Sequence, residues 1–433
     1  MSVIRWLLNG IAAILLVALG AILLLITTMW VADPAVPRNI FFGQPISAPA
    51  SVELSQPQAL VAGVTQEVPS GHNTETNTDS DPSPDPAIDT AIDPELFDPL
   101  VFGEAVRYAD ESRSVALLVQ QGGVIRYERY WPGYDVTTRT NPNSMHKPVL
   151  ALLLGAAIAD GYIGSVDDAA ALWLPEWRGD ARRDITLRHL LQMASGLEVP
   201  VFGTWKSAKI LFGSDLVAGV IGLVAEKPAG SDFQYSNANS QLLALVIERA
   251  TGRPYAEYLS QRLWQPLGAG DAFLWLDRPG GMPRGFCCLF ATARDWLRVG
   301  ELLLNRGAWG GEPLVPRDYV EAMLSPSATN PNFGFQLWLG SPKGQIRKYN
   351  DYTVTAFHSV PFVVEDVITV DGYGGQRVYI VPSRELIIVR TGVSRSDWDD
   401  AVIPNAVLRA LRLNGLGVST ESERNMTVEG AIQ

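Results

Sequence analysis

Residues 6–32 form a run of 27 positions without a charged side chain, and this run limits most strongly how the chain can fold. About 20 apolar residues cross a bilayer as a helix. The apolar part of a secretory signal peptide is shorter, about 7–15 residues. We therefore predict a transmembrane signal anchor over 6–32, with a cleaved signal peptide as the alternative. Arg5 precedes the run and Asp33 follows it, so the positive-inside rule places residues 1–5 in the cytoplasm and the bulk of the chain outside.

The segment after this run is strongly acidic. Eleven of its side chains between positions 33 and 100 are Asp or Glu, against the single base Arg38, so it carries most of the net charge of −12. It is also rich in Pro, Ser, Thr and Asn, a composition that buries little apolar surface and repels itself. We predict a disordered acidic linker over 33–96, a globular domain over 97–415 and a flexible tail over 416–433. The globular part is close to neutral, and an overall pI near 4.9 argues against nucleic-acid binding.

The chain has two cysteines, Cys287 and Cys288, and they are adjacent. Neighbouring cysteines bridge only through a strained ring, so we expect no disulfide and interpret both as small buried residues, with a redox-active pair as the alternative. No Cys-x-x-Cys or Cys/His cluster is present, so we expect no metal site.

From position 97 the pattern is that of a mixed α/β (α+β) domain. Two β-rich runs, 114–120 and 124–130, are joined by a glycine turn and predict a hairpin, and 376–381 and 386–390 predict a second hairpin. Between them lie helical patterns. The predicted helices are a nearly all-apolar one from position 144, and others at 186–194, 239–251, 255–263, 293–305 and 398–412. We therefore predict one antiparallel sheet made from both ends of the domain and flanked by helices, with a mostly helical region inserted.

The strongest chemical signal is Ser144-Met145-His146-Lys147, an S-x-x-K sequence at the start of the apolar helix. Positions i and i+3 of a helix share one face, so the lysine amine can reach the serine hydroxyl. Burial lowers the pKa of a lysine and lets the amine accept the serine proton. Pro148 fits only a first turn, which fixes the helix start near Ser144. His146 lies off the shared face, so a structural role is the expectation for it.

Two further motifs follow in the sequence. Tyr235-Ser236-Asn237 precedes a helix and offers a phenol and an amide to one cavity, where Tyr235 would move a proton and Asn237 would bind a substrate carbonyl. The third motif lies directly before a strand, where glycines let a substrate approach a backbone N–H closely. It consists of Gly372, Tyr373, Gly374, Gly375 and Gln376.

The order of these motifs resembles that of the serine β-lactamase and penicillin-binding-protein superfamily, whose pattern combines S-x-x-K with S-D-N and K-T-G. The Y-S-N sequence is similar to class C β-lactamases and related esterases. Further stretches at 184–198, 233–243, 252–268 and 288–307 also look like this group, and the resemblance covers about 105–412. Within the superfamily the sequence looks most like the 6-aminohexanoate-dimer hydrolase-like serine hydrolases.

The resemblance implies a β-lactamase/transpeptidase-like fold and an acyl-enzyme mechanism without a cofactor. Ser144 would attack a carbonyl, with Lys147 as general base assisted by Tyr235, and backbone N–H groups of Ser144 and Gln376 would hold the oxyanion. Tyr373 occupies the position that is usually Lys or His in the family, where a cation favours the carboxylate of β-lactams and peptidoglycan peptides. Tyr373 is either a wall of the pocket or a packed aromatic.

The sequence thus predicts a serine hydrolase that acts on a small amide or ester. It would be anchored in the lipid bilayer of a bacterial inner membrane, with the catalytic domain in the periplasm. Two alternatives stay open. One is a β-lactamase or D-Ala-D-Ala carboxypeptidase, and the other is a non-catalytic envelope binding module. The sequence does not define the oligomeric state.

Overall fold

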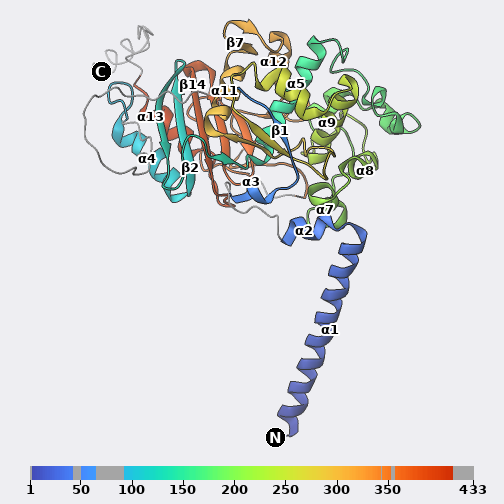
Figure 1. Cartoon of the computed structure of the whole chain (residues 1–433). Coiled ribbons are helices and arrows are strands. Elements are labelled where there is room, and N and C mark those ends of the chain that lie inside the picture. Colours follow the sequence, from blue (N-terminus) through green and yellow to red (C-terminus); the bar gives the residue numbers. More distant parts are fainter. Residues whose placement is uncertain (1, 42–49, 65–91, 343, 353–355, 413–433) are drawn as a thin grey trace, which may run out of the picture.

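The computed structural model describes residues 2–41, 50–64, 92–342, 344–352 and 356–412. A long N-terminal helix projects from a body in which a sheet lies beside a mostly helical region (Figure 1). The predicted tail over 416–433 lies outside the described residues.

The main sheet has six antiparallel strands in the order β3-β2-β14-β13-β12-β9. In that order the strands are β3 (Val124–Tyr130), β2 (Ser114–Gln121), β14 (Leu386–Gly392), β13 (Gln376–Val381), β12 (Ile368–Gly372) and β9 (Trp338–Leu339). Strand β2 from the start of the domain pairs directly with β14 from its end. The predicted sheet from both ends of the domain is therefore confirmed, and both predicted hairpins are part of it.

Alternation along the strands gives the sheet two apolar faces. In β2, Ala116 and Leu118 join a large core on one face, whereas Leu117 and Val119 join a smaller core on the other. Successive side chains of a strand point to opposite faces, so a run in which every residue is buried requires a layer on each side. The helices α4 (Pro99–Glu111) and α13 (Val402–Ala410) pack on the face of the smaller core, and α11 (Ala293–Leu304) packs on the other (Figure 1).

The inserted region between β3 and β12 is mostly helical, as the sequence predicts. Its long helices are α5 (His146–Ala159) and α9 (Asn237–Thr251), which contact each other. The shorter ones are α6 (Leu187–Leu191), α7 (Trp205–Phe212), α8 (Leu216–Ile221), α10 (Tyr255–Leu259) and α12 (Arg317–Met323). The buried stretch of α5 begins at His146 and continues to Ala157, so this helix runs through the core, and the two motifs at the starts of α5 and α9 are held by rigid elements.

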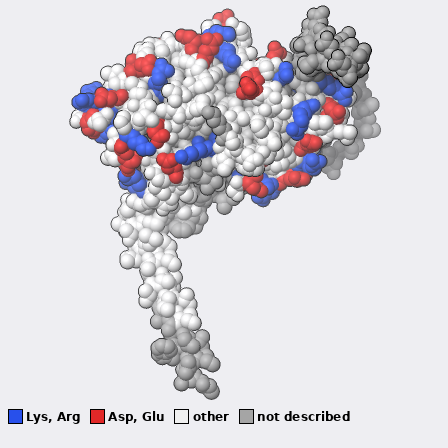
Figure 2. Space-filling view, turned by 180° about the vertical axis from the view of Figure 1, so that it is seen from behind, with Lys and Arg blue, Asp and Glu red and all other residues white. Residues whose placement is uncertain are grey.

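Helix α1 (Ser2–Ala32) extends away from the body. Its segment Ile14–Ala32 has 19 residues with a mean hydropathy of 2.6, which is long and apolar enough to cross a membrane. Its described side chains bear no charge, whereas Lys, Arg, Asp and Glu are scattered over the body (Figure 2).

The prediction of a disordered linker over 33–96 is wrong for residues 33–41 and 50–64. Helix α2 (Ala35–Phe41) packs against α7, and α3 (Ala50–Leu54) leads into β1 (Gln58–Val61). Strand β1 pairs with β5 (Ala272–Trp275) at the edge of a four-stranded sheet that also holds β6 (Leu289–Thr292) and β4 (Arg139–Thr140). Composition averaged over 33–96 hid apolar residues in this part of the chain, such as Val61, which is fully buried and helps attach the segment to the core of the domain.

Residues 33–41 are attached by polar contacts as well. Asp33 accepts a hydrogen bond from the backbone N–H of Ser214 at 3.0 Å, and the amide of Asn39 donates to the carbonyl of Phe212 at 2.7 Å. The chain that leaves α1 therefore meets the body at the C-terminal end of α7. Within the predicted linker, residues 42–49 and 65–91 lie outside the described residues.

The prediction for the cysteines is also wrong, because Cys287 and Cys288 form a disulfide bond. In an extended strand their side chains would point to opposite faces. Cys288 instead has a φ of 68°, in the left-handed region, so the alternation is broken and the two sulfur atoms can bond. Both residues are buried, as predicted.

Candidate active site

The S-x-x-K motif begins in a 3-10 turn, η1 (Asn143–Met145), that runs directly into α5. Asn143 adopts a φ of 50°, a left-handed conformation that Asn tolerates better than most residues. Its amide donates to the carbonyl of Tyr373 at 3.0 Å, which ties the turn to the third motif. Pro148 stands in the first turn of α5, as the sequence predicts. Ser144 lies within this turn and is half-buried.

Lys147 lies fully buried behind the serine and has three hydrogen-bond partners. Its Nζ is 2.8 Å from Oγ of Ser144, 2.9 Å from Oδ1 of Asn237 and 2.8 Å from the carbonyl oxygen of Phe286. The amide oxygen and the carbonyl only accept hydrogen bonds, whereas the serine hydroxyl can donate as well. A neutral amine would therefore give its two hydrogens to Asn237 and Phe286 and turn its lone pair toward Ser144.

Burial lowers the pKa of Lys147 from 10.5 to about 7, and the negative charge of Asp371 acts in the opposite direction. Desolvation penalises the charged ammonium because water no longer solvates it. A base with a pKa near the working pH combines a large deprotonated fraction with strong proton affinity. Lys147 thus has both the geometry and the pKa of a general base for Ser144.

Tyr235 lies on the loop before α9 and reaches the same two residues. Its hydroxyl is hydrogen-bonded to the Ser144 side chain, and Lys147 Nζ lies 4.9 Å from the centre of its ring. Burial raises the pKa of Tyr235, the charge of Asp371 raises it further, and the hydrogen bond to Ser144 opposes both. The phenol is therefore neutral at physiological pH, so it can donate a proton or relay one.

An aromatic cluster holds Tyr235 in place. Trp338 stacks on its ring at 6.0 Å, and Tyr349 contacts it edge-on at 5.1 Å. The backbone N–H of Tyr235 donates to the carbonyl of Tyr349 at 2.9 Å, and Asn350 donates to its carbonyl oxygen at 2.8 Å. Sequence reasoning missed these contacts, since the loop residues 325–370 follow no readable pattern. The only hint was the aromatic content of this region.

Asp371 is the second group that the sequence did not indicate. It is buried on β12, accepts a hydrogen bond from the Tyr349 hydroxyl and forms an ion pair with Arg377 at 2.6 Å. Its carboxylate raises the pKa of both Lys147 and Tyr235, although it contacts neither side chain through a hydrogen bond. Nothing in its local sequence marks it, because the effect depends on charges brought close by folding.

The third motif, residues 372–376, lies against the turn η1 that holds Ser144. A Cβ at Gly372 would stand 2.1 Å from the carbonyl oxygen of Pro142 and 3.1 Å from Met145, so the edge of β12 approaches η1 as closely as backbone can. Gly372 pairs with Gln376 across the turn between β12 and β13. The structure therefore brings all three motifs to one place.

The residues of this turn differ in what they do. Gly374 and Gly375 have φ values of 77° and 87°, and a Cβ on either would collide with Ser394 or Trp398, so they are required by the turn itself. The side chain of Gln376 points into the sheet, where it exchanges two hydrogen bonds with the backbone of Gly392. Tyr373 is 68% exposed, which excludes the packed-aromatic alternative.

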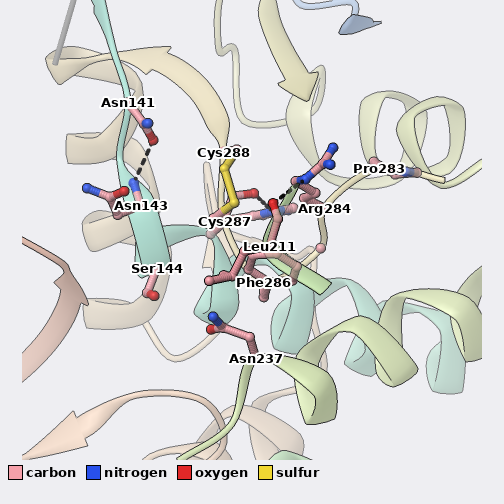
Figure 3. The surroundings of a disulfide bond; sticks show 12 residues. Asn141, Asn143, Ser144, Leu211, Asn237, Pro283, Arg284, Phe286, Cys287 and Cys288 are labelled. Carbon is pink, nitrogen blue, oxygen red and sulfur yellow. Dashed lines mark hydrogen bonds between the residues drawn. A yellow bond between two sulfur atoms is a disulfide. The ribbon is translucent and has the colours of Figure 1, made fainter. Parts of the chain in front are cut away.

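His146 faces away from the nucleophile, in agreement with the structural role expected for it. It is fully buried, and its Nδ1 lies 2.9 Å from the carbonyl oxygen of Cys287 while Nε2 lies 2.9 Å from the Tyr255 hydroxyl. The carbonyl only accepts, so Nδ1 carries the proton and Nε2 accepts from Tyr255. Burial lowers the pKa of His146 to about 4, and the ring is neutral. Figure 3 shows the Cys287–Cys288 disulfide together with Ser144 and Asn237 of the site.

The arrangement of a serine, a buried lysine and a tyrosine at the junction of a helical region and an antiparallel sheet is that of a serine acyl-transfer enzyme. The Beta-lactamase family model matches residues 102–409. The chain therefore belongs to the β-lactamase family, and its hydrolase character and its β-lactamase/transpeptidase fold, both predicted from the sequence, are confirmed.

Individual relatives differ in what they act on. The 6-aminohexanoate-dimer hydrolase of Paenarthrobacter ureafaciens is 26% identical over 67% of this chain and 74% of its own length. Esterase EstB of Burkholderia gladioli is 32% identical over 30% of this chain and 36% of its own length. The octameric penicillin-binding protein homologue from Pyrococcus abyssi has the same fold, with a TM-score of 0.53, 17% identity and coverage of 71% of this chain and 76% of that one.

Proposed function

We propose that this protein is a membrane-anchored serine hydrolase that cleaves a small amide or ester through an acyl-enzyme on Ser144. The observation that carries the proposal is the position of Lys147 Nζ, 2.8 Å from the Ser144 hydroxyl with only acceptor groups as its other partners. A residue with an ordinary helix-start role would not have its ammonium buried without a carboxylate beside it, since the desolvation cost is high.

In the acylation step, the neutral amine of Lys147 takes the hydroxyl proton of Ser144 as Oγ attacks the substrate carbonyl. The C–O or C–N bond to the leaving group then breaks, and the neutral phenol of Tyr235 donates a proton to that group while Lys147 returns one to Tyr235. The hydrogen bond between Tyr235 and Ser144 and the 4.9 Å approach of Nζ to the ring support this relay.

In the deacylation step, water attacks the ester of Ser144 in the same way. Tyr235 takes the proton of the water while passing its own proton to Lys147, and Lys147 then gives a proton to Oγ of Ser144 as the acid product leaves. We assign the oxyanion site to the backbone N–H groups of Ser144 and Gln376. The close packing of Gly372 on Pro142 supports this assignment, because it brings the start of β13 next to the nucleophile turn.

The substrate class follows from the exposed Tyr373. An aromatic hydroxyl there offers stacking and a hydrogen bond but no positive charge for a substrate carboxylate. The relatives named as a 6-aminohexanoate-dimer hydrolase and an esterase support a linear amide or an ester. The β-lactamase or D-Ala-D-Ala carboxypeptidase alternative, and the non-catalytic alternative, become outcomes of the test below.

We place the protein at the bacterial inner membrane, with 1–5 in the cytoplasm, 6–32 as the anchor and the hydrolase domain over 97–415 in the periplasm. The apolar stretch Ile14–Ala32 supports the anchor. Helix α2 follows the anchor directly and packs on α7, which supports an anchor that ends next to the catalytic domain.

The test uses the full-length protein in detergent with a fluorophosphonate probe, nitrocefin, short-chain nitrophenyl esters and linear amides. Labelling of Ser144 together with ester or amide turnover that Ser144→Ala abolishes is the expected result. Faster turnover of nitrocefin than of esters and amides would favour the β-lactamase alternative. An unlabelled native protein without turnover of any substrate would overturn the proposal and favour a binding module.

A further inference from the structure

Residues 284–288 form a short segment beneath Lys147 whose start is firmly held. The guanidinium of Arg284 is fully buried and donates to three backbone carbonyls, one of them that of Leu211 at 2.9 Å (Figure 3). The side chain of Gln241 on α9 accepts a hydrogen bond from the backbone N–H of Gly285 at 2.9 Å. The segment is therefore fixed to the core just before it reaches the active site.

The next two carbonyls of this segment hold two consecutive residues of α5. The carbonyl of Phe286 accepts from Lys147 Nζ at 2.8 Å, and the carbonyl of Cys287 accepts from Nδ1 of His146 at 2.9 Å. The Phe286 carbonyl thus fixes a hydrogen of the Lys147 amine, and the Cys287 carbonyl fixes the ring tautomer of His146. The direction of both carbonyls depends on the backbone at the two cysteines.

The disulfide restricts that backbone directly. A bond between adjacent cysteines closes the smallest ring that a disulfide can form in a chain, so it limits the rotation of the peptide between them. Cys288 sits at a φ of 68°, which is unfavourable for a residue with a Cβ. Without the bond, the backbone at Cys288 is free to return toward an extended conformation, and the preceding carbonyls turn with it.

We propose that the Cys287–Cys288 disulfide is a redox-sensitive positioning element that aligns the Phe286 carbonyl with Lys147 and so keeps the amine directed at Ser144. In the disulfide form, Asn237 and Phe286 take the two hydrogens of the neutral amine. In the dithiol form, the backbone hydrogen bond from the Cys287 N–H to the Arg284 carbonyl at 3.1 Å is what remains within the segment to orient the Phe286 carbonyl, so the lone pair points at Ser144 for a smaller fraction of the time. The proposal rests on the proposed role of Ser144 as nucleophile.

The reaction is a thiol–disulfide exchange with a dithiol reductant. A thiolate of the reductant attacks Sγ of Cys287, the more exposed of the pair, and the S–S bond breaks so that Cys288 leaves as a thiolate and takes up a proton. The second thiol of the reductant then attacks the mixed disulfide. It releases Cys287 as a thiol and leaves the reductant as a disulfide, with two electrons transferred. The reverse reaction with an oxidised dithiol carrier restores the bond, which suits an oxidising compartment.

The experiment compares the full-length protein before and after treatment with dithiothreitol. Mass spectrometry after alkylation of the denatured protein counts free thiols, and the rate of fluorophosphonate labelling of Ser144 is measured across pH 5–9. We expect no free thiols before treatment and two afterwards. We also expect slower labelling after reduction, by about 10-fold to 10²-fold, since a misplacement of about 1 Å at a reacting group costs up to that amount.

The double variant Cys287→Ser/Cys288→Ser is the matched control, because it lacks the bond and keeps the volume of the side chains. It should label at the rate of the reduced protein and should not respond to dithiothreitol. Two free thiols in the untreated protein would overturn the proposal. So would a double variant with the labelling rate and pH profile of the untreated protein.

A second measurement separates this proposal from the proposed function. Hydrogen–deuterium exchange at the imidazole carbon of His146 reports its burial and pKa without any turnover, and His189 on α6 serves as the internal reference. Faster exchange at His146 alone after reduction supports the positioning role. Unchanged exchange at His146 contradicts it, whereas a failure of Ser144 to label in the oxidised protein contradicts only the hydrolase proposal.

Discussion

The Nζ of Lys147 lies 2.9 Å from Oδ1 of Asn237, although 90 positions separate the two residues in the chain. The contact exists because α5 and α9 pack against each other with their first turns at the same level, next to the edge of the main sheet. Each helix supplies one motif, and the sheet supplies the third. The site is therefore a product of how two helices and one strand edge meet.

Removal of the lysine amine should nearly abolish acylation. For Lys147→Ala we expect a loss of about 10²-fold to 10⁴-fold in the labelling rate of Ser144, the usual contribution of a general base. The control is Lys206→Ala, which removes an exposed lysine paired with Glu198 on the surface. A Lys147→Ala protein that labels within a factor of three of wild type would show that another group deprotonates Ser144.

The pH dependence of acylation should follow the lowered pKa of Lys147. The pKa is about 7, so the amine is protonated and inactive below that value and becomes neutral above it. We expect kcat/KM to rise about tenfold per pH unit below pH 7 and then to level off. Stopped-flow labelling of Ser144 between pH 5 and 10 measures this pH dependence. A profile that keeps rising to pH 10 would mean that the lysine has its ordinary pKa.

Asn237 should affect the pH dependence of acylation through its contact with the amine of Lys147. In Asn237→Asp a carboxylate replaces the amide oxygen beside Nζ, and an opposite charge stabilises the ammonium. The pKa of Lys147 then rises, and the pH dependence should move to higher pH by about 1–3 units. Asn237→Ala, which removes the acceptor without adding a charge, should slow acylation without that upward movement. Equal profiles for the two variants would refute an electrostatic origin.

Stability should also depend on pH through Lys147. Its folded pKa of about 7 lies below the unfolded value of 10.5, so between these values the unfolded state binds a proton that the folded state does not. The free energy of unfolding therefore rises with pH between pH 7 and 10.5. Below pH 7 the full cost of burying the charged ammonium of Lys147 destabilises the folded state. The Lys147→Met variant has no ammonium to bury, so its Tm should exceed that of wild type by a large amount at pH 6 and by less toward pH 10. A Tm difference independent of pH would contradict the shift.

The approach of β12 to the nucleophile turn leaves no room for a side chain. A Cβ at Gly372 would lie 2.1 Å from the Pro142 carbonyl, so Gly372→Ala must displace the turn or the strand. We expect a loss of about 1–3 kcal/mol in stability from overpacking and a larger proportional loss in labelling rate. Gly103→Ala on α4 is the control, since its Cβ meets nothing within 4 Å and the change favours the helix. Thermal melts and labelling of both variants check this.

Several parts of the fold could be predicted from the sequence because the signals are local. Alternating and apolar runs, turn glycines and Pro148 fix the strands β2, β3, β13 and β14 and the start of α5. The S-x-x-K spacing alone puts Lys147 within reach of Ser144, since one helical turn separates them. The order of the motifs then indicated the family.

Other parts could not be predicted because they depend on contacts between distant residues. The composition of residues 33–64 suggested disorder, but α2 and β1 are ordered by surfaces that α7 and β5 provide. The cysteine pair was expected to stay reduced, but the left-handed backbone at Cys288 turns both sulfurs to one side.

The sequence by itself determined which residues we propose as catalytic, because each motif is short and its geometry is set within one turn of helix or strand. Only the tertiary structure decided how that chemistry is tuned. The pKa of Lys147 depends on burial and on the charge of Asp371, and the direction of its lone pair depends on Asn237 and the Phe286 carbonyl. Desolvation and Coulomb interactions act through space, so they are defined only once the helices, the sheet edge and the disulfide segment have come together.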